Sequence, residues 1–208
     1  NEWNHLVDTF SNLGRYSHKI ENVNGTQRGA TRGTYYTITE DKIIKKSIFE
    51  THFVDTPFDD IRYILSFLGV GQGKKLVDPA MGAGVVCAIG HLLGAYVEGV
   101  EIDRERYDVS REAWDDFENG ISRKINYDPL HFGNGLKHPI GHADCVWCYV
   151  DSGEQKEFLK RFIEAAKPEA IFVLRYPTEE CREIAKAHSL ERISAGELSE
   201  SFLALRKR

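Results

Sequence analysis

Two acids and two glycines occupy fixed positions within residues 75–103 of the chain. Asp78 follows a short apolar segment and precedes Gly82 and Gly84, and Glu101 closes the next apolar segment. Glycine adopts backbone angles that other residues cannot, so the pair would let a ligand approach the main chain closely. The small, apolar stretch after Gly84 predicts a helix whose first N–H groups are unpaired and carry partial positive charge. The pattern is typical of a nucleoside-binding corner in an α/β sheet.

Two classes of nucleoside ligand fit this pattern. A dinucleotide site has the motif G-x-G-x-x-G, with an acid about 20 residues further on. Here Cys87 stands where the third glycine belongs, and Asp78 would place a negative charge against the pyrophosphate. S-adenosylmethionine carries positive charge and no phosphate, so it suits Asp78 better, and Glu101 would then bind the ribose hydroxyls. The spacing alone leaves NAD open.

The rest of the chain predicts the elements that position this motif. One helix is expected within residues 1–13, and another begins at Thr56 as N-cap, has Pro57 at its first position and ends at Gly69. From the motif onward, strand and helix patterns alternate. The expected strands are residues 76–77, 96–100, 125–127, 145–150, 170–174, 190–193 and 202–206, and the expected helices are the stretch up to residue 93 and residues 104–119, 154–166 and 178–187.

This order of elements predicts an α/β fold, a doubly wound and mostly parallel sheet of seven strands. The short connection between the last two strands predicts a C-terminal antiparallel hairpin. Residues 51–208 would form this domain, and residues 1–50 an N-terminal arm or cap. Within the arm, residues 14–39 are rich in threonine and glycine and predict a loop that closes with a strand at 35–38. That loop is either a solvated arm or a flap that faces the substrate.

The composition is that of an ordinary globular protein, with 41% hydrophobic and 28% charged residues in a chain of 208. No run of 18 apolar residues occurs in the sequence, so we expect no membrane span and no membrane partner. A net charge of −5 gives no general attraction to nucleic acid. The four cysteines are expected to be buried thiols of a reducing compartment, which favours a cytoplasmic location.

No metal site is expected from the spacing of cysteines and histidines. Cys145 and Cys148 form a CxxC pair on a predicted strand, where residues three apart point to opposite faces and cannot chelate one ion. His138 and His142 stand four apart, but Pro139 interrupts the helix that would align them. We therefore expect both histidines to lie in a loop.

These residues together resemble the class I S-adenosylmethionine-dependent methyltransferases over roughly residues 50–208. Asp78-x-x-x-Gly82-x-Gly84 matches the first motif of that family, Glu101 matches its ribose-binding acid, and residues 132–134 resemble the segment that flanks the adenine. The resemblance implies S-adenosylmethionine as the cofactor. It also implies the following cofactor-binding residues: Thr56, Asp78, Ala80, Met81, Gly82, Gly84, Glu101, Ile102 and Asn134.

The segments around the motif suggest which methyl acceptor is used. The threonine-proline lead-in helix and the layout of residues 134–174 are similar to those of small archaeal protein-lysine methyltransferases and non-SET histone-lysine methyltransferases. This similarity implies a nitrogen acceptor on a macromolecule, with a protein lysine favoured. The Asp78-Pro79 start also fits nucleic-acid amino-methyltransferases, but their Asp/Asn-Pro-Pro-Tyr/Phe signature is absent at residues 151–153. A catalytically inactive partner subunit stays open as an alternative.

Tyr149 and Asp151 are the candidate catalytic residues. They stand at the carboxyl end of the fourth strand, where open α/β sheets place reactive groups. A phenol or carboxylate there could accept the proton that a lysine must lose before it attacks. Ser152 and the glutamine three residues later also fit a capping box, in which case Asp151 only supports a helix start. Arg175 and the tyrosine after it are expected to be exposed to solvent.

Overall fold

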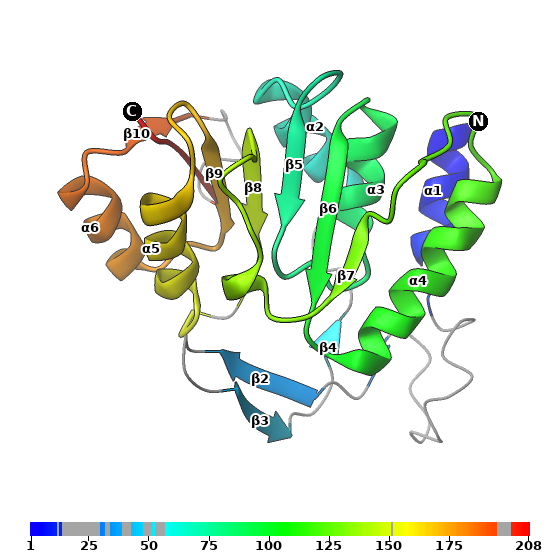
Figure 1. Cartoon of the computed structure of the whole chain (residues 1–208), viewed down its shortest axis with the longest axis horizontal. Coiled ribbons are helices and arrows are strands. Elements are labelled where there is room, and N and C mark those ends of the chain that lie inside the picture. The colour runs from blue at the N-terminus through cyan, green and yellow to red at the C-terminus, as the bar shows by residue number, and fades with distance from the viewer. Residues whose placement is uncertain are drawn as a thin grey trace.

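The computed structural model describes residues 1–11, 13, 57–150, 152–194 and 201–208, together with the backbone of four short strands between residues 30 and 52. Thr56 and Asp151 lie outside the described residues. Figure 1 shows a central sheet with helices on both faces. None of the described helices is both long enough and apolar enough to cross a membrane.

The central sheet has seven strands in the order β10-β11-β9-β8-β5-β6-β7. Strands β5 to β9 run parallel to one another, whereas β11 is antiparallel to both β9 and β10. The expected seven-stranded, mostly parallel sheet with a C-terminal antiparallel hairpin is therefore confirmed. Its strands are β5 (Lys75–Asp78), β6 (Tyr96–Glu101), β7 (Leu130–Phe132), β8 (Cys145–Cys148), β9 (Ile171–Arg175), β10 (Glu191–Ile193) and β11 (Phe202–Arg206).

Two hydrophobic clusters bind helices to opposite faces of this sheet. One cluster joins the sheet to four helices, and the other joins it to two. In Figure 1, α5 lies next to β9 with α6 on its outer side, and α2 and α3 lie behind β5 and β6. The first four helices are α1 (Glu2–Ser11), α2 (Phe58–Phe67), α3 (Val85–Leu92) and α4 (Arg104–Asn119), and the last two are α5 (Gln155–Ala165) and α6 (Glu179–Ala187).

The boundaries of the helices follow the expected stop signals more closely than the start signals. Gly69 and Gly94 have positive φ angles of 73° and 99° just after α2 and α3, and so end these helices as glycine commonly does. Helix α2 begins at Phe58, which places Pro57 at the N-cap rather than at the first helical position. The expectation that Pro57 is the first helical residue is wrong by one position.

One expected strand, residues 125–127, does not form. The third parallel strand is instead β7, whose ladder with β6 pairs Leu130 with Gly99. Tyr127 serves the sheet in another way, because its hydroxyl accepts a hydrogen bond of 2.9 Å from the Val97 N–H of β6. The ladder begins only after Pro129, whose carbonyl accepts from the Gly99 N–H at 2.8 Å.

Four short strands precede the main domain. β1 (Ala30–Thr31) pairs with β4 (Thr51–His52), and β2 (Thr34–Ile38) pairs with β3 (Ile43–Ser47), both antiparallel. The expected strand at 35–38 thus lies within β2. In Figure 1 the β2–β3 pair lies beyond the ends toward which β5 and β6 point.

Candidate functional site

The loop between β5 and α3 turns sharply at two glycines. Gly82 and Gly84 have φ angles of 54° and 84°, in the left-handed region that favours glycine. Gly84 is the N-cap of α3. The loop is anchored to the next strand, because the Met81 N–H donates to the Val100 carbonyl at 2.9 Å. The conformational role expected of the two glycines is confirmed.

Asp78 ends β5 and is almost fully buried, with 2% of its surface exposed. One of its carboxylate oxygens, Oδ1, accepts a hydrogen bond of 3.1 Å from the Ala80 N–H. Burial is the main influence on the Asp78 carboxyl and raises its pKa to about 7; the Ala80 N–H acts in the opposite direction and Glu101 in the same one. A carboxyl in this state would gain from a cationic ligand, which favours its ionised form.

Glu101 ends β6, the strand beside β5, and is 6% exposed. Burial raises the pKa of its carboxyl to about 7, against the effect of the Asp103 N–H, which donates to Glu101 Oε1 at 2.8 Å. Asp103 has a different task, because its own Oδ1 caps α4 by accepting from the Arg106 N–H at 2.9 Å. Of the two acids at the end of β6 and just beyond it, Asp103 caps a helix and Glu101 does not.

The segment after β7 closes over the motif loop. The Gly133 N–H donates to the Glu101 carbonyl at 2.9 Å, and the Asn134 Oδ1 accepts from the Leu136 N–H at 2.9 Å. A Cβ atom on Gly135 would lie 1.8 Å from the Pro79 carbonyl oxygen, so only glycine fits there. This contact brings the ends of β5, β6 and β7 together, and sequence reasoning missed Gly135.

Two expected cofactor residues have packing roles in the structure. The buried Met81 side chain lies against Gly99 of β6, where an added Cβ atom would be 2.4 Å from the Met81 sulfur. Ile102 is partly buried and packs against the second hydrophobic cluster. A glycine in the middle of a strand signals such a close approach, so Gly99 could have been found from the sequence.

An aromatic and cationic group lies at the ends of β8 and β9. The guanidinium carbon of Arg175 stands 4.8 Å from the centre of the Tyr149 ring and 4.5 Å from that of Tyr176. Tyr176 is 53% exposed, as expected, but Arg175 is only 4% exposed, so its expected exposure is wrong. Arg175 is buried because the two rings and Phe202 surround its guanidinium group. The structure leaves the position of Asp151 undescribed.

The expected capping box at the start of α5 does not form. The N-cap residue of α5 is Glu154 and makes no side-chain capping bond. Gln155 is instead buried and links the ends of β8 and β9, since its Nε2 donates to the Val150 carbonyl at 3.4 Å and to the Tyr176 carbonyl at 3.0 Å. Its Oε1 accepts from the Thr178 N–H at 3.0 Å. Gln155 therefore holds the chain just after β9 in place.

The cysteines lie as expected. All four are buried and free. Cys145 packs in the first hydrophobic cluster and Cys148 in the second, so the CxxC pair does point to opposite faces of the sheet. Burial raises the pKa of both thiols, that of Cys145 to about 12, which keeps them protonated and inert.

No protein-family model matches this chain, and no curated protein matches it in sequence. Solved structures do match. An RNA methyltransferase from Salinibacter ruber in complex with S-adenosyl-L-homocysteine superposes with a TM-score of 0.57 at 16% identity, over 74% of this chain and 92% of that one. A magnesium protoporphyrin IX methyltransferase from Synechocystis, with bound S-adenosylhomocysteine, gives a TM-score of 0.57 at 12% identity, over 73% and 82%.

A third similar structure is the ribosomal protein L11 methylase from Lactobacillus delbrueckii, with a TM-score of 0.52 at 15% identity, over 73% of this chain and 79% of that one. These likenesses establish the fold. The chain has the Rossmann-like fold of class I methyltransferases, with the strand order and the antiparallel C-terminal strands described above.

Proposed function

We propose that this protein is an S-adenosylmethionine-dependent methyltransferase. The observation that carries the proposal is the pair of buried carboxyls, Asp78 and Glu101, at the ends of adjacent parallel strands. Burial raises both pKa values to about 7 and so disfavours the ionised carboxylates. A positively charged ligand with a ribose diol would stabilise these ionised forms. A pyrophosphate would meet two acids instead of donors, so a dinucleotide fits this pair poorly.

The residues around the pair fit this cofactor. Glu101 would accept hydrogen bonds from the ribose hydroxyls, and Asp78 would face the cationic part. The positive φ angles of Gly82 and Gly84 let the cofactor approach the main chain. The remaining proposed contacts are Ala80, Met81, Ile102, Asn134 and Thr56. When bound, the cofactor supplies a sulfonium methyl group that is open to in-line displacement.

Isothermal titration calorimetry tests the cofactor assignment. We expect S-adenosylmethionine and S-adenosylhomocysteine to bind one per chain at pH 8, and NADH not to bind under the same conditions. Heat from NADH but none from the methyl donor would overturn the proposal. Binding of the cofactor without methyl transfer to any acceptor would instead identify the inactive partner subunit.

For the acceptor, we propose the side-chain amine of a protein lysine. The group Tyr149, Arg175 and Tyr176 supports this choice, because it lies at the carboxyl ends of β8 and β9, next to the position of the cofactor motif. A lysine must be neutral when it attacks, and the positive charge of Arg175 would disfavour a second cation beside it. Tyr149 and Asp151 are proposed to accept the proton.

The charge of the whole chain and the place of its first strands also support a protein acceptor. The net charge of −5 favours a basic protein over a phosphate backbone. The β2–β3 pair lies beyond the carboxyl ends of the parallel strands in Figure 1, so the part of residues 1–50 that forms this pair is proposed to contact the acceptor. The similar structures are methyltransferases named for RNA, porphyrin and ribosomal-protein substrates, so the fold alone does not determine the methyl acceptor.

Transfer of a radiolabelled methyl group decides the acceptor. We expect label in protein when the enzyme is mixed with fractionated cell extract, and its recovery as methyl-lysine after hydrolysis. The Asp151→Asn variant should transfer more slowly with unchanged cofactor binding. Label recovered in RNA or DNA, with protein unlabelled, would overturn the lysine proposal and leave the cofactor proposal intact.

A further inference from the structure

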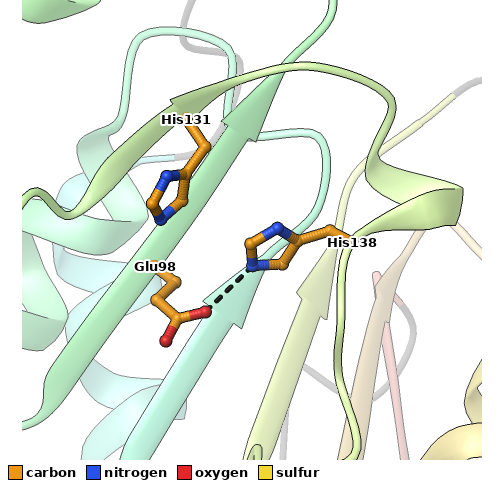
Figure 2. Close-up of side chains that lie close together, drawn as sticks. All are labelled: Glu98, His131 and His138. Carbon is orange, nitrogen blue, oxygen red and sulfur yellow. Dashed lines mark hydrogen bonds and ion pairs between the residues drawn. The ribbon is translucent and has the colours of Figure 1, made fainter.

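Three side chains from separate segments converge on the face of the sheet that carries α5. They are Glu98 in the middle of β6, His131 in β7 and His138 just after the short 3-10 helix η2 (Gly135–Lys137). Figure 2 shows the His138 ring joined to the Glu98 carboxylate by a hydrogen bond, with the His131 ring beside them. One nitrogen or oxygen of each residue lies within 4.8 Å of those of the others. The rings of His131 and His138 stack with centres 5.2 Å apart.

The fold leaves this face open where the three residues meet. Between β7 and β8 the described chain forms only η2, and no α-helix lies over β6 in the view of Figure 1. Glu98 and Glu101 are three residues apart on one strand and so point to opposite faces. The cluster is separate from the proposed cofactor site, about 10 Å from it along the strand.

Both oxygens of the Glu98 carboxylate are already held by imidazoles. His138 Nε2 lies 2.9 Å from Oε2, and His142 Nε2 lies 3.0 Å from Oε1. The side chains are partly exposed to solvent, Glu98 by 28% and His138 by 15%. A small ion can therefore reach them.

We propose that Glu98, His131 and His138 form a binding site for a divalent transition-metal ion of the zinc class. Two imidazoles and one carboxylate suit Zn²⁺ or Co²⁺, whereas Mg²⁺ and Ca²⁺ require oxygen ligands. His142 is a positioning residue, which fixes the carboxylate through its second oxygen in the manner of other outer-shell partners. A fourth position is left for water.

The geometry needs little change to accept the ion. Bond lengths of about 2.0–2.2 Å in a tetrahedral site put ligand atoms roughly 3.3–3.5 Å apart. The Glu98–His138 pair would open by about half an ångström from its present 2.9 Å, and the widest separation would shrink from at most 4.8 Å. Chain spacing did not reveal the site, because its ligands come from two strands and a loop. Bound metal would tie residues 131–142 to β6, where the fold has no covering helix.

Zinc titration of the full chain, without a histidine tag and after treatment with EDTA, tests the proposal. We expect one Zn²⁺ per chain by calorimetry, and no binding of Mg²⁺. The variants His131→Ala and His138→Ala should bind no detectable Zn²⁺. His142→Ala should bind about 10- to 100-fold more weakly. His188→Ala, which removes an exposed imidazole after α6, is the matched control and should bind as the wild type does.

A second readout guards against variants that fail to fold. Each variant must first give the circular dichroism spectrum of the wild type. Co²⁺ should then produce the visible absorption bands of a four-coordinate site in the wild type and His188→Ala, but not in His138→Ala. Zn²⁺ that fails to bind the folded wild type, or binds all variants equally, would overturn the proposal. The assay contains no methyl donor, so its result is independent of the proposed methyltransferase activity.

Discussion

Strand β6 carries two glutamates, three residues apart, and the pKa values of their carboxyls are shifted in opposite directions. Glu98 meets two imidazoles, and its pKa is lowered mainly by the hydrogen bond with His138. Glu101 is buried at the end of the strand, and burial raises its pKa to about 7. The two residues share a residue type and a strand, so their different neighbours cause the difference.

The two glutamates differ in whether groups of the chain itself stabilise the carboxylate. Glu98 has its compensating groups within the chain, so it is stable as an anion before any ion binds. Glu101 has backbone donors only from the two residues that follow it among the influences on its pKa, with the Asp103 N–H at 2.8 Å, and it shares its surroundings with the buried Asp78. A buried carboxylate without a full set of partners is costly, and this cost is the reason that Glu101 is proposed to bind the cofactor.

The largest expected effect is a difference in cofactor affinity between variants of the two glutamates. Glu101→Gln should weaken S-adenosylhomocysteine binding about 100-fold or more at pH 8, because two charge-assisted hydrogen bonds to the ribose are lost. Glu98→Gln should stay within about twofold, since it faces the other side of the sheet. Equal losses in the two variants, measured by calorimetry, would place the ribose elsewhere.

The pH dependence of cofactor binding should follow Asp78 and Glu101 and not Glu98. Both groups must be ionised in the complex, and each is largely protonated below its free-state pKa of about 7. Affinity should therefore fall about 100-fold from pH 8 to pH 6, roughly tenfold for each group. An affinity that is flat over this range would show that neither carboxyl meets the cofactor.

The segment that joins the two sites gives a third test. Gly135→Ala forces a Cβ atom against the Pro79 carbonyl and should lower the free energy of unfolding by about 1–3 kcal/mol. Gly133→Ala is the matched control, because nothing lies within 4 Å of its added Cβ atom. Chemical denaturation measures both variants. Similar stabilities for the two would contradict the close approach of this segment to the motif loop.

The smallest expected effect is on the stability of the ligand-free protein, with opposite signs. The pKa of Glu101 is raised on folding, so its contribution to stability is present at low pH and is lost as pH rises through about 7. The pKa of Glu98 is lowered, so its contribution is present at neutral pH and is lost on acidification. At pH 8, Glu101→Gln should stabilise the protein and Glu98→Gln should destabilise it, each by about 1 kcal/mol.

Thermal unfolding in the absence of cofactor measures these changes. A fall in the midpoint for Glu101→Gln, of the size seen for Glu98→Gln, would mean that Glu101 is already compensated within the chain. It would then no longer mark a ligand site.

Much of the fold followed from patterns that are local in the sequence. Apolar strands bounded by glycine and acid residues predicted β5 and β6, and Gly69 ends α2 as expected. The expected strand at 125–127 was wrong because Tyr127 uses its hydroxyl, not its backbone, to meet β6. A single side-chain hydrogen bond to a strand produces no periodic pattern of apolar residues, so the sequence does not reveal it.

The candidate site was predictable where it depends on one stretch of chain and not where it depends on distant contacts. Asp78 and Glu101 lie within a single β-α-β unit, so their spacing was informative. Three contacts join residues that are 26 to 56 positions apart in the sequence. They are the contact of Gly135 with Pro79, that of Arg175 with Tyr149, and that of His131 and His138 with Glu98. Only the packing of the sheet brings such residues together.

Proton release on cofactor binding tests the central claim most directly. At pH 7 Asp78 and Glu101, each with a pKa of about 7, together hold about one proton, which a cationic cofactor would displace. Calorimetry of S-adenosylmethionine binding in two buffers of different ionisation enthalpy gives this number. We expect about one proton released per chain in the wild type and in Glu98→Gln, and about half that in Asp78→Asn if binding persists. Binding with no proton release in the wild type would contradict the assignment of the two buried carboxyls to the cofactor.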